Sequence, residues 1–207
     1  MRRPLLPGTL LACAFLSGCS FFPQFHEARF NNGDGAAGEN ILVVPFRESR
    51  RGWYGESRDG RGVVAFLRQW TEARSVDARF VESEISQEVL HRVYNWPKKT
   101  IRRGDWVNLA RPAGVRYLVE GDILSLKLDN PLTVGFFDPE ALIRYRVIDL
   151  QDGREVHSRE RWKLQQSGRE SEFRVSYDFD DPEKVRAQFL AYIAKRLGQE
   201  LYGYYED

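Results

Sequence analysis

Apolar and polar residues alternate with two periods along this chain, and a change of period separates expected strands from expected helices. The run Ile41-Leu42-Val43-Val44-Pro45-Phe46 is short and apolar, as in a buried strand. Residues 47–61 are rich in Arg, Gly and Ser and predict a loop. Apolar residues at 63, 66, 67 and 70 have the spacing of a helical stripe. The first third of the chain therefore predicts a strand, a loop and a helix.

Short elements are expected next. Residues 78–82 predict a second strand, and Ser83 can cap a helix whose apolar stripe is Ile85, Val89 and Val93. Asp105 can cap another short helix, which Pro112 and Gly114 end. Strands and helices thus alternate through this part of the chain.

The second half is dominated by strand patterns. Residues 115–128 predict a long strand with a bend at Gly121. Residues 142–150 alternate, with Tyr145 among the apolar side chains of one face, and Asp152-Gly153 predicts a hairpin turn into a strand over 156–164. Residues 173–179 alternate like a half-buried strand. A final helix from Asp181-Pro182 is expected to bury Val185, Phe189, Ile193, Leu197 and Leu201.

This order of elements predicts an α/β (α+β) fold, a single mixed sheet of about five to six strands with helices packed on it. The expected domain covers residues 41–207. Residues 19–40 have no helical or strand period, and the Gly-, Ala- and Asn-rich stretch 31–40 predicts a flexible tether.

The chain begins with a targeting pattern. Arg2 and Arg3 precede an apolar run over 5–16, and Leu16-Ser17-Gly18-Cys19 resembles the lipobox of bacterial lipoproteins. The run is shorter than the roughly 20 apolar residues that a membrane span needs, and Pro7 and Gly8 interrupt it. We therefore expect a lipoprotein signal peptide at 1–18 and lipidation of the Cys19 sulfur.

The residue after the cysteine indicates which membrane is reached. Ser20 follows Cys19, and a residue other than aspartate there resembles the outer-membrane signal of Gram-negative lipoproteins. The expected location is the periplasmic face of the outer membrane, with palmitate or a related acyl chain as anchor.

Composition narrows the possible partners and chemistry. Loss of residues 1–18 removes Arg2 and Arg3, which leaves 29 Lys+Arg against 30 Asp+Glu and argues against a nucleic-acid binder. Cys13 leaves with the signal peptide and Cys19 is used for lipid, so no cysteine remains for a disulfide or a thiolate metal site.

Three segments resemble a known group of envelope domains. They are the strand 41–46, the segment Gly114-Val115-Arg116-Tyr117-Leu118-Val119-Glu120-Gly121, and the hairpin around Asp149 and Gly153. Their order resembles the amino-terminal domain of the TolB translocation protein, the curli-secretion lipoprotein and the lipoprotein activator of penicillin-binding proteins. The resemblance implies a periplasmic domain that docks onto other proteins and has no catalytic residues to carry over.

The sequence motifs that could indicate enzyme chemistry lack the context that such chemistry requires. Gly60-Arg61-Gly62-Val63-Val64-Ala65 matches a dinucleotide-binding turn but does not directly follow a strand. His26, His91 and His157 lack a second ligand at metal-binding spacing. We therefore expect no enzyme activity, no cofactor and no metal, although a spatial pair of carboxylates is invisible in sequence.

Two segments are candidate contact sites. Residues 96–103 concentrate basic side chains around Trp96, which suits anionic lipid or an acidic protein, or simply a solvated loop. Residues 134–137, Val-Gly-Phe-Phe, are an apolar tip or part of the core. The expected function is protein docking in envelope assembly or maintenance. The alternatives are a subunit of an oligomeric secretion or transport complex and a binder of glycan or lipid fragments.

Overall fold

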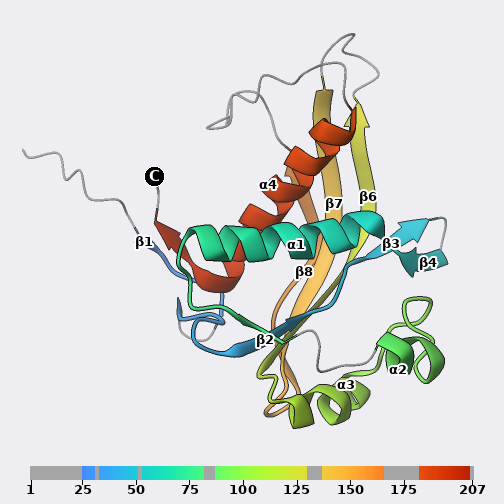
Figure 1. Ribbon diagram of the computed structural model, residues 1–207, viewed down its shortest axis with the longest axis vertical. Coiled ribbons are helices and arrows are strands. Elements are labelled where there is room, and N and C mark those ends of the chain that lie inside the picture. The colour runs from blue at the N-terminus through green and yellow to red at the C-terminus, as the bar shows by residue number, and fades with distance from the viewer. Residues whose placement is uncertain are drawn as a thin grey trace, which may run out of the picture.

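The computed structural model describes residues 25–30, 33–50, 53–81, 87–129, 137–165 and 182–205. Within them lie four α-helices, nine strands and one 3-10 turn (Figure 1). In chain order these are β1 (Phe25–His26), β2 (Asn40–Val43), β3 (Arg47–Arg50), β4 (Trp53–Glu56), α1 (Arg58–Ala73), β5 (Arg79–Phe80), α2 (Gln87–Arg92), α3 (Arg103–Ala110), the 3-10 turn Arg111–Ala113, β6 (Tyr117–Asp129), β7 (Phe137–Asp149), β8 (Arg154–Gln165), α4 (Pro182–Tyr202) and β9 (Tyr204–Tyr205).

The long strand β6 organises the main sheet. On one side it pairs antiparallel with β7, which pairs in turn with β8. On its other side the first part of β6 pairs in parallel with β2, and a later part pairs in parallel with β3. Both strands can share one neighbour because the chain bends through Val44, Pro45 and Phe46 between them. The predicted mixed α/β architecture is confirmed.

The main sheet has seven described strands, more than the five to six predicted. The difference arises at residues 47–56, predicted as a loop, which form the antiparallel hairpin β3–β4. This segment has no alternation of apolar and polar residues, and its first residues extend the sheet by pairing Arg47 with Asp122 and Glu48 with Ile123. The strand predicted at 173–179 lies outside the described residues.

Helices α1 and α4 cover one face of the sheet and cross each other there (Figure 1). The predicted stripe of α4 is confirmed, since all its members are buried and all except Val185 belong to this core. These members are Val185, Phe189, Ile193, Leu197 and Leu201. At the crossing, a Cβ added to Gly198 would lie 2.4 Å from the Trp70 ring, so the helices approach closely because Gly198 has no side chain.

A second core lies on the opposite face of the sheet. Trp106 of α3 packs there with Leu118 of β6 and Ile148 of β7, which alternate with the residues of the first core. The buried Trp96 and Ile101 attach the connection between α2 and α3 to this core. Val93, predicted to lie on a buried helical stripe, is instead 68% exposed, because α2 ends at Arg92 and the stripe does not continue.

The described part of the predicted tether lies against the domain. Residues Phe25 and His26 pair antiparallel with Tyr205 and Tyr204, and Phe30 and Ala36 are buried in the first core. The Ala36 amide also donates a hydrogen bond of 2.9 Å to the Leu201 carbonyl. The chain is therefore fixed to the end of α4 from residue 25 onward over its described positions.

Among the described helices, none is both long enough and apolar enough to cross a bilayer.

Candidate functional site

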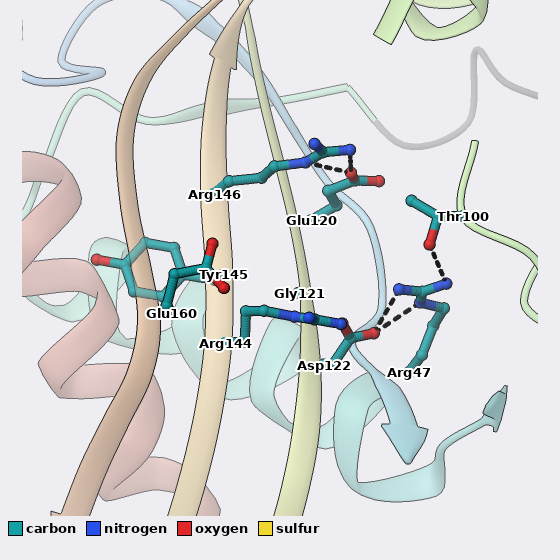
Figure 2. A pocket seen from close by; sticks show the side chains of 9 residues that line it. All are labelled: Arg47, Thr100, Glu120, Gly121, Asp122, Arg144, Tyr145, Arg146 and Glu160. Atoms are coloured by element: carbon teal, nitrogen blue, oxygen red, sulfur yellow. Dashed lines mark hydrogen bonds and ion pairs between the residues drawn. The ribbon is translucent and has the colours of Figure 1, made fainter. Parts of the chain in front are cut away.

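The second face of the sheet is polar beyond the α3 core, and it forms a groove there. Strand alternation turns Glu120 and Asp122 of β6 and Arg144 and Arg146 of β7 toward this side (Figure 2). Together with Arg47, Thr100 and Glu160 they line a groove of about 210 Å³. We call it the arginine–carboxylate groove.

Asp122 is the buried centre of this groove, with 2% of its surface exposed. Its Oδ1 accepts a hydrogen bond of 2.7 Å from Arg47 Nε, and its Oδ2 accepts one of 3.0 Å from Arg144 Nε. The Asp122 bond raises the pKa of Arg144 above its ordinary value. Two guanidinium groups therefore share one carboxylate, and this part of the groove carries a net positive charge.

Tyr54 of β4 supports the same arginines from the hairpin. Its ring lies under the Arg47 guanidinium, 4.7 Å from ring centroid to Cζ, and its hydroxyl accepts a hydrogen bond of 3.4 Å from Arg144 Nη2. A cation over an aromatic face is stabilised by the ring quadrupole. The β3–β4 hairpin thus positions one wall of the groove.

Glu120 is held separately. Arg146 Nε donates to Glu120 Oε1 over 2.6 Å, and Trp106 Nε1 donates to Glu120 Oε2 over 2.9 Å. The indole N–H of Trp106, in the second core, therefore has a hydrogen-bond acceptor in Glu120 of the groove lining. Both oxygens of Glu120, like both of Asp122, already accept protein hydrogen bonds.

The basic stretch predicted at 96–103 reaches the groove through Thr100, which is among its lining residues (Figure 2). Thr100 Oγ1 accepts a hydrogen bond of 2.9 Å from Arg47 Nη1, which links the stretch to Asp122. Trp96 and Ile101 are buried, whereas the four cations of the stretch are exposed, and these are Lys98, Lys99, Arg102 and Arg103. We call these four residues the basic rim.

The arrangement is suited to binding and poorly suited to acid–base catalysis. A catalytic carboxylate needs an oxygen within reach of a substrate proton, and the oxygens of Glu120 and Asp122 are occupied by arginine and tryptophan donors. Glu160, the third carboxylate at the groove, is exposed. The chemical capacity of the groove is charge complementarity toward an anionic surface.

A second polar cluster lies between β7, β8 and the end of α4. Glu200 Oε2 accepts hydrogen bonds from the Tyr145 hydroxyl over 2.5 Å and from Arg159 Nε over 3.1 Å, and it lies 2.9 Å from His157 Nε2. Burial acts to raise the pKa of Glu200, but these three partners outweigh it and lower the pKa to about 2. Burial and the Glu200 bond raise the pKa of Tyr145. The cluster attaches α4 to the sheet.

The other predicted sites are dispersed or lie outside the description. Cys19 and residues 134–136 are outside the described residues, as is the Phe137 side chain, although the Phe137 backbone begins β7. His26, His91 and His157 lie in β1, α2 and β8, and no group of three or more potential metal ligands occurs in the described parts of the chain. Gly60, from the dinucleotide-like motif, is inside the first turn of α1, where its missing side chain leaves room for the Phe46 carbonyl.

Sequence reasoning missed Arg47, Asp122 and Glu200 as members of clusters. Arg47 and Asp122 are 75 positions apart, and Tyr145 and Glu200 are 55 apart. Besides the basic stretch 96–103, the available signal was the alternation in 142–150, which placed Arg144 and Arg146 on the face away from Tyr145. The structure confirms that placement.

No protein-family model and no curated protein matches the chain. Similar solved structures include the following three. The PelC dodecamer from Paraburkholderia phytofirmans has 12% identity and a TM-score of 0.46, with 81% of this chain and 89% of that chain covered. Lipoprotein GNA1162 from Neisseria meningitidis has 10% identity, a TM-score of 0.44 and coverage of 78% and 99%. The LpoB C-terminal domain from Escherichia coli has 17% identity, a TM-score of 0.41 and coverage of 63% and 85%. These TM-scores, all below 0.5, correspond to a partial overlap of element arrangement and transfer no function to this chain.

Proposed function

We propose that this chain is a non-enzymatic lipoprotein, anchored through Cys19 at the periplasmic face of the outer membrane, that docks an acidic protein surface in the arginine–carboxylate groove. The lining of the groove holds three arginines and three carboxylates, and the exposed cations of the neighbouring stretch 98–103 add positive charge beside it. The observation that carries the docking role is this added charge together with the pair of arginines on one carboxylate. Asp122 is shared by Arg47 and Arg144, and the basic rim adds four exposed cations. A partner with clustered carboxylates complements this surface.

The groove is preorganised for such a partner. Arg47 is fixed by Asp122, Thr100 and the Tyr54 ring, so little side-chain entropy remains to be lost on binding. The exposed cations of the rim supply long-range attraction, which raises the association rate more than the final affinity. The expected complex therefore forms quickly and weakens as salt concentration rises.

The anchor makes a weak complex effective. Lipid on Cys19 confines the domain to a thin layer at the membrane surface, so a partner in the same layer meets it at high local concentration. The Leu16-Ser17-Gly18-Cys19 sequence, with Arg2 and Arg3 before the apolar run, supports this anchor.

The anchor is tested by metabolic labelling with radioactive palmitate in a Gram-negative host. We expect label on the unaltered chain and none on Cys19→Ala. Cys13→Ala is the matched control, because Cys13 leaves with the signal peptide and its loss keeps the label. Equal labelling of Cys19→Ala and the unaltered chain would refute the anchor.

The docking surface is tested by a photo-crosslinking amino acid at position 99 in intact cells. We expect a protein partner whose yield falls by about fivefold or more when Lys98→Glu and Arg102→Glu are combined, since like charges are then opposed. Lys184→Glu is the control, because Lys184 lies on α4 at the opposite face of the sheet.

The crosslinked species also distinguishes the alternatives. A second copy of this chain would favour the oligomeric-subunit role, and a glycan or lipid adduct would favour the ligand-binding role. Equal yields with the rim variant and with the Lys184→Glu control would contradict docking at the groove.

A further inference from the structure

The aromatic ribbon β1–β9 lies beside a pocket lined by arginine side chains. Phe25 and Tyr205 are 47% and 58% exposed, and their ring centroids are 4.9 Å apart. Apart from Val93 and Val156, they are the exposed large hydrophobic side chains of the described residues. His26 and Tyr204 stack next to them, with ring centroids 4.7 Å apart. An exposed pair of aromatic rings in contact on a two-stranded ribbon indicates a candidate interaction surface.

Two exposed arginines lie beside this ribbon, and two acids share the same pocket lining with them. A pocket of about 330 Å³ adjoins the ribbon, and its lining includes Arg29, Arg196 and the two acids Glu27 and Glu200. Glu200 is already bound by Arg159, and Arg29 reaches it only at 4.0 Å with 63% of the Arg29 side chain exposed. Arg196 is exposed and makes no ion pair or hydrogen bond with the other described residues.

The path of the chain indicates what lies over this surface. Residues 20–24 are the whole connection between Cys19 and Phe25. Six steps of extended chain span at most about 22 Å, so a lipid on Cys19 keeps β1 within that distance of the bilayer. The tether expected over 19–40 would have allowed a longer reach, but its residues from 25 onward lie on the domain over their described positions.

We infer that the β1–β9 ribbon, with Arg29 and Arg196, rests on the phospholipid headgroup layer. Phe25 and the tyrosines are suited to the interfacial zone, where an aromatic ring can bury its body and keep a polar edge wet. The two arginines reach lipid phosphates while their stems follow the apolar surface. This inference rests on the proposed anchor and adds an orientation to it.

The orientation leaves the docking surface accessible. The β3–β4 hairpin, which carries Arg47 and Tyr54, lies on the opposite side of the domain from β1 (Figure 1). A domain seated on the membrane through β1–β9 therefore holds the arginine–carboxylate groove away from the lipid. In this orientation the β1–β9 ribbon contacts the membrane, and the arginine–carboxylate groove remains accessible to a protein partner.

The test uses the full lipidated chain in vesicles of phosphatidylethanolamine and phosphatidylglycerol that contain nitroxide-headgroup lipid. A fluorophore is attached to Glu27→Cys, beside the ribbon, or to Lys99→Cys, on the basic rim. After processing and lipidation, the introduced thiol is the only free one. We expect quenching at position 27 and about twofold less or none at position 99, since the nitroxide acts only near the headgroups.

Variants then identify the contact. Phe25→Ser with Tyr205→Ser should abolish the difference between the two positions, and Arg196→Glu should lower the ratio of seated to free domain roughly fivefold. Arg58→Glu, in α1, is the control and should leave quenching unchanged.

The outcomes separate the two proposals. Absence of the protein from the vesicles means that the lipid anchor has failed. A vesicle-bound protein with equal quenching at 27 and 99 keeps the anchor and overturns the seated orientation. Quenching that survives the loss of both aromatic rings also overturns the assignment to the ribbon.

Discussion

The Tyr145 hydroxyl of β7 donates a hydrogen bond of 2.5 Å to Glu200 Oε2 near the end of α4. Arg159 and His157 of β8 contact the same carboxylate. Because Tyr145, His157 and Arg159 belong to the sheet and Glu200 to the helix, the cluster holds the last turns of α4 against the strands. The first three predictions below depend on such long-range contacts, and the fourth on a local cap.

Acid is expected to weaken this attachment. The folded pKa of Glu200 is lowered to about 2 from 4.5, so its contribution is full above about pH 5 and is lost as pH falls toward 2. The shift corresponds to a loss of about 3 kcal/mol in the free energy of unfolding across that window. Urea unfolding at pH 6 and pH 3 should detect about 2 kcal/mol of this loss, because pH 3 is still above the folded pKa. Glu200→Gln should show a smaller decrease between the two pH values, whereas the exposed Glu160→Gln should decrease like the unaltered chain. Equal pH dependence in all three proteins would contradict the attribution of the acid-induced loss of stability to Glu200.

Removal of the shared carboxylate in the groove should strongly destabilise the fold. Asp122→Ala leaves the buried Arg47 guanidinium without its main partner, and we expect a loss of about 3 kcal/mol in the free energy of unfolding. Asp152→Ala is the control, because Asp152 pairs with Arg154 at an exposed turn, where such pairs contribute about 1 kcal/mol or less. Chemical denaturation gives the free energy of unfolding of both variants for comparison with the unaltered chain. A loss below that of Asp152→Ala would mean that Asp122 does not hold the arginines.

Two helical glycines give a matched pair. Gly198→Ala places a Cβ 2.4 Å from the Trp70 ring where α1 and α4 cross, and we expect overpacking to cost about 1–3 kcal/mol. Gly104→Ala in α3 meets nothing within 4 Å, and alanine is the better helix former, so stability should rise by up to about 1 kcal/mol. Thermal unfolding should therefore shift in opposite directions for the same substitution. A melting temperature that is unchanged or raised in Gly198→Ala would show that the crossing tolerates a methyl group.

The start of α1 depends on a side-chain cap. Ser57 Oγ accepts a hydrogen bond of 3.0 Å from the Gly60 amide. Ser57→Ala should lower the free energy of unfolding by about 1 kcal/mol, while Ser57→Asp keeps an acceptor and should change it by only a few tenths. Similar losses in the two variants would indicate that the cap contributes little and that packing alone fixes the helix start.

The elements with a clear period were predictable from sequence. The turn at Asp152-Gly153 was recognised because such turns need a positive φ, and Gly153 has φ 71°. The bend expected at Gly121 stays a prediction, because β6 keeps its register with β7 there and first shifts between Ile123 and Ser125. Gly121 instead leaves room for the Phe46 ring, which would lie 2.9 Å from a Cβ at this position. The hairpin β3–β4 was missed because its strands are polar and short, and their place is fixed by pairing with β6 rather than by their own pattern.

The candidate site was less predictable than the fold. Strand alternation placed Arg144 and Arg146 on one face, and the basic stretch drew attention to Lys98 and its neighbours. Nothing local indicates that Thr100 accepts from Arg47 or that Arg47 and Arg144 share Asp122, because these contacts depend on how distant strands align. The Phe25–Tyr205 contact joins positions near the two ends of the sequence and was hidden for the same reason.

The pairing of β1 with β9 brings the segment that follows Cys19 and the residues after α4 to one place. Under the proposed lipid anchor at Cys19, a reporter or affinity tag fused after Tyr205 would emerge near the bilayer and compete with it for space. An epitope inserted in the exposed turn at Asp152 would avoid that crowding. Fusions at these two positions should differ in how readily an antibody or resin captures them from intact membranes.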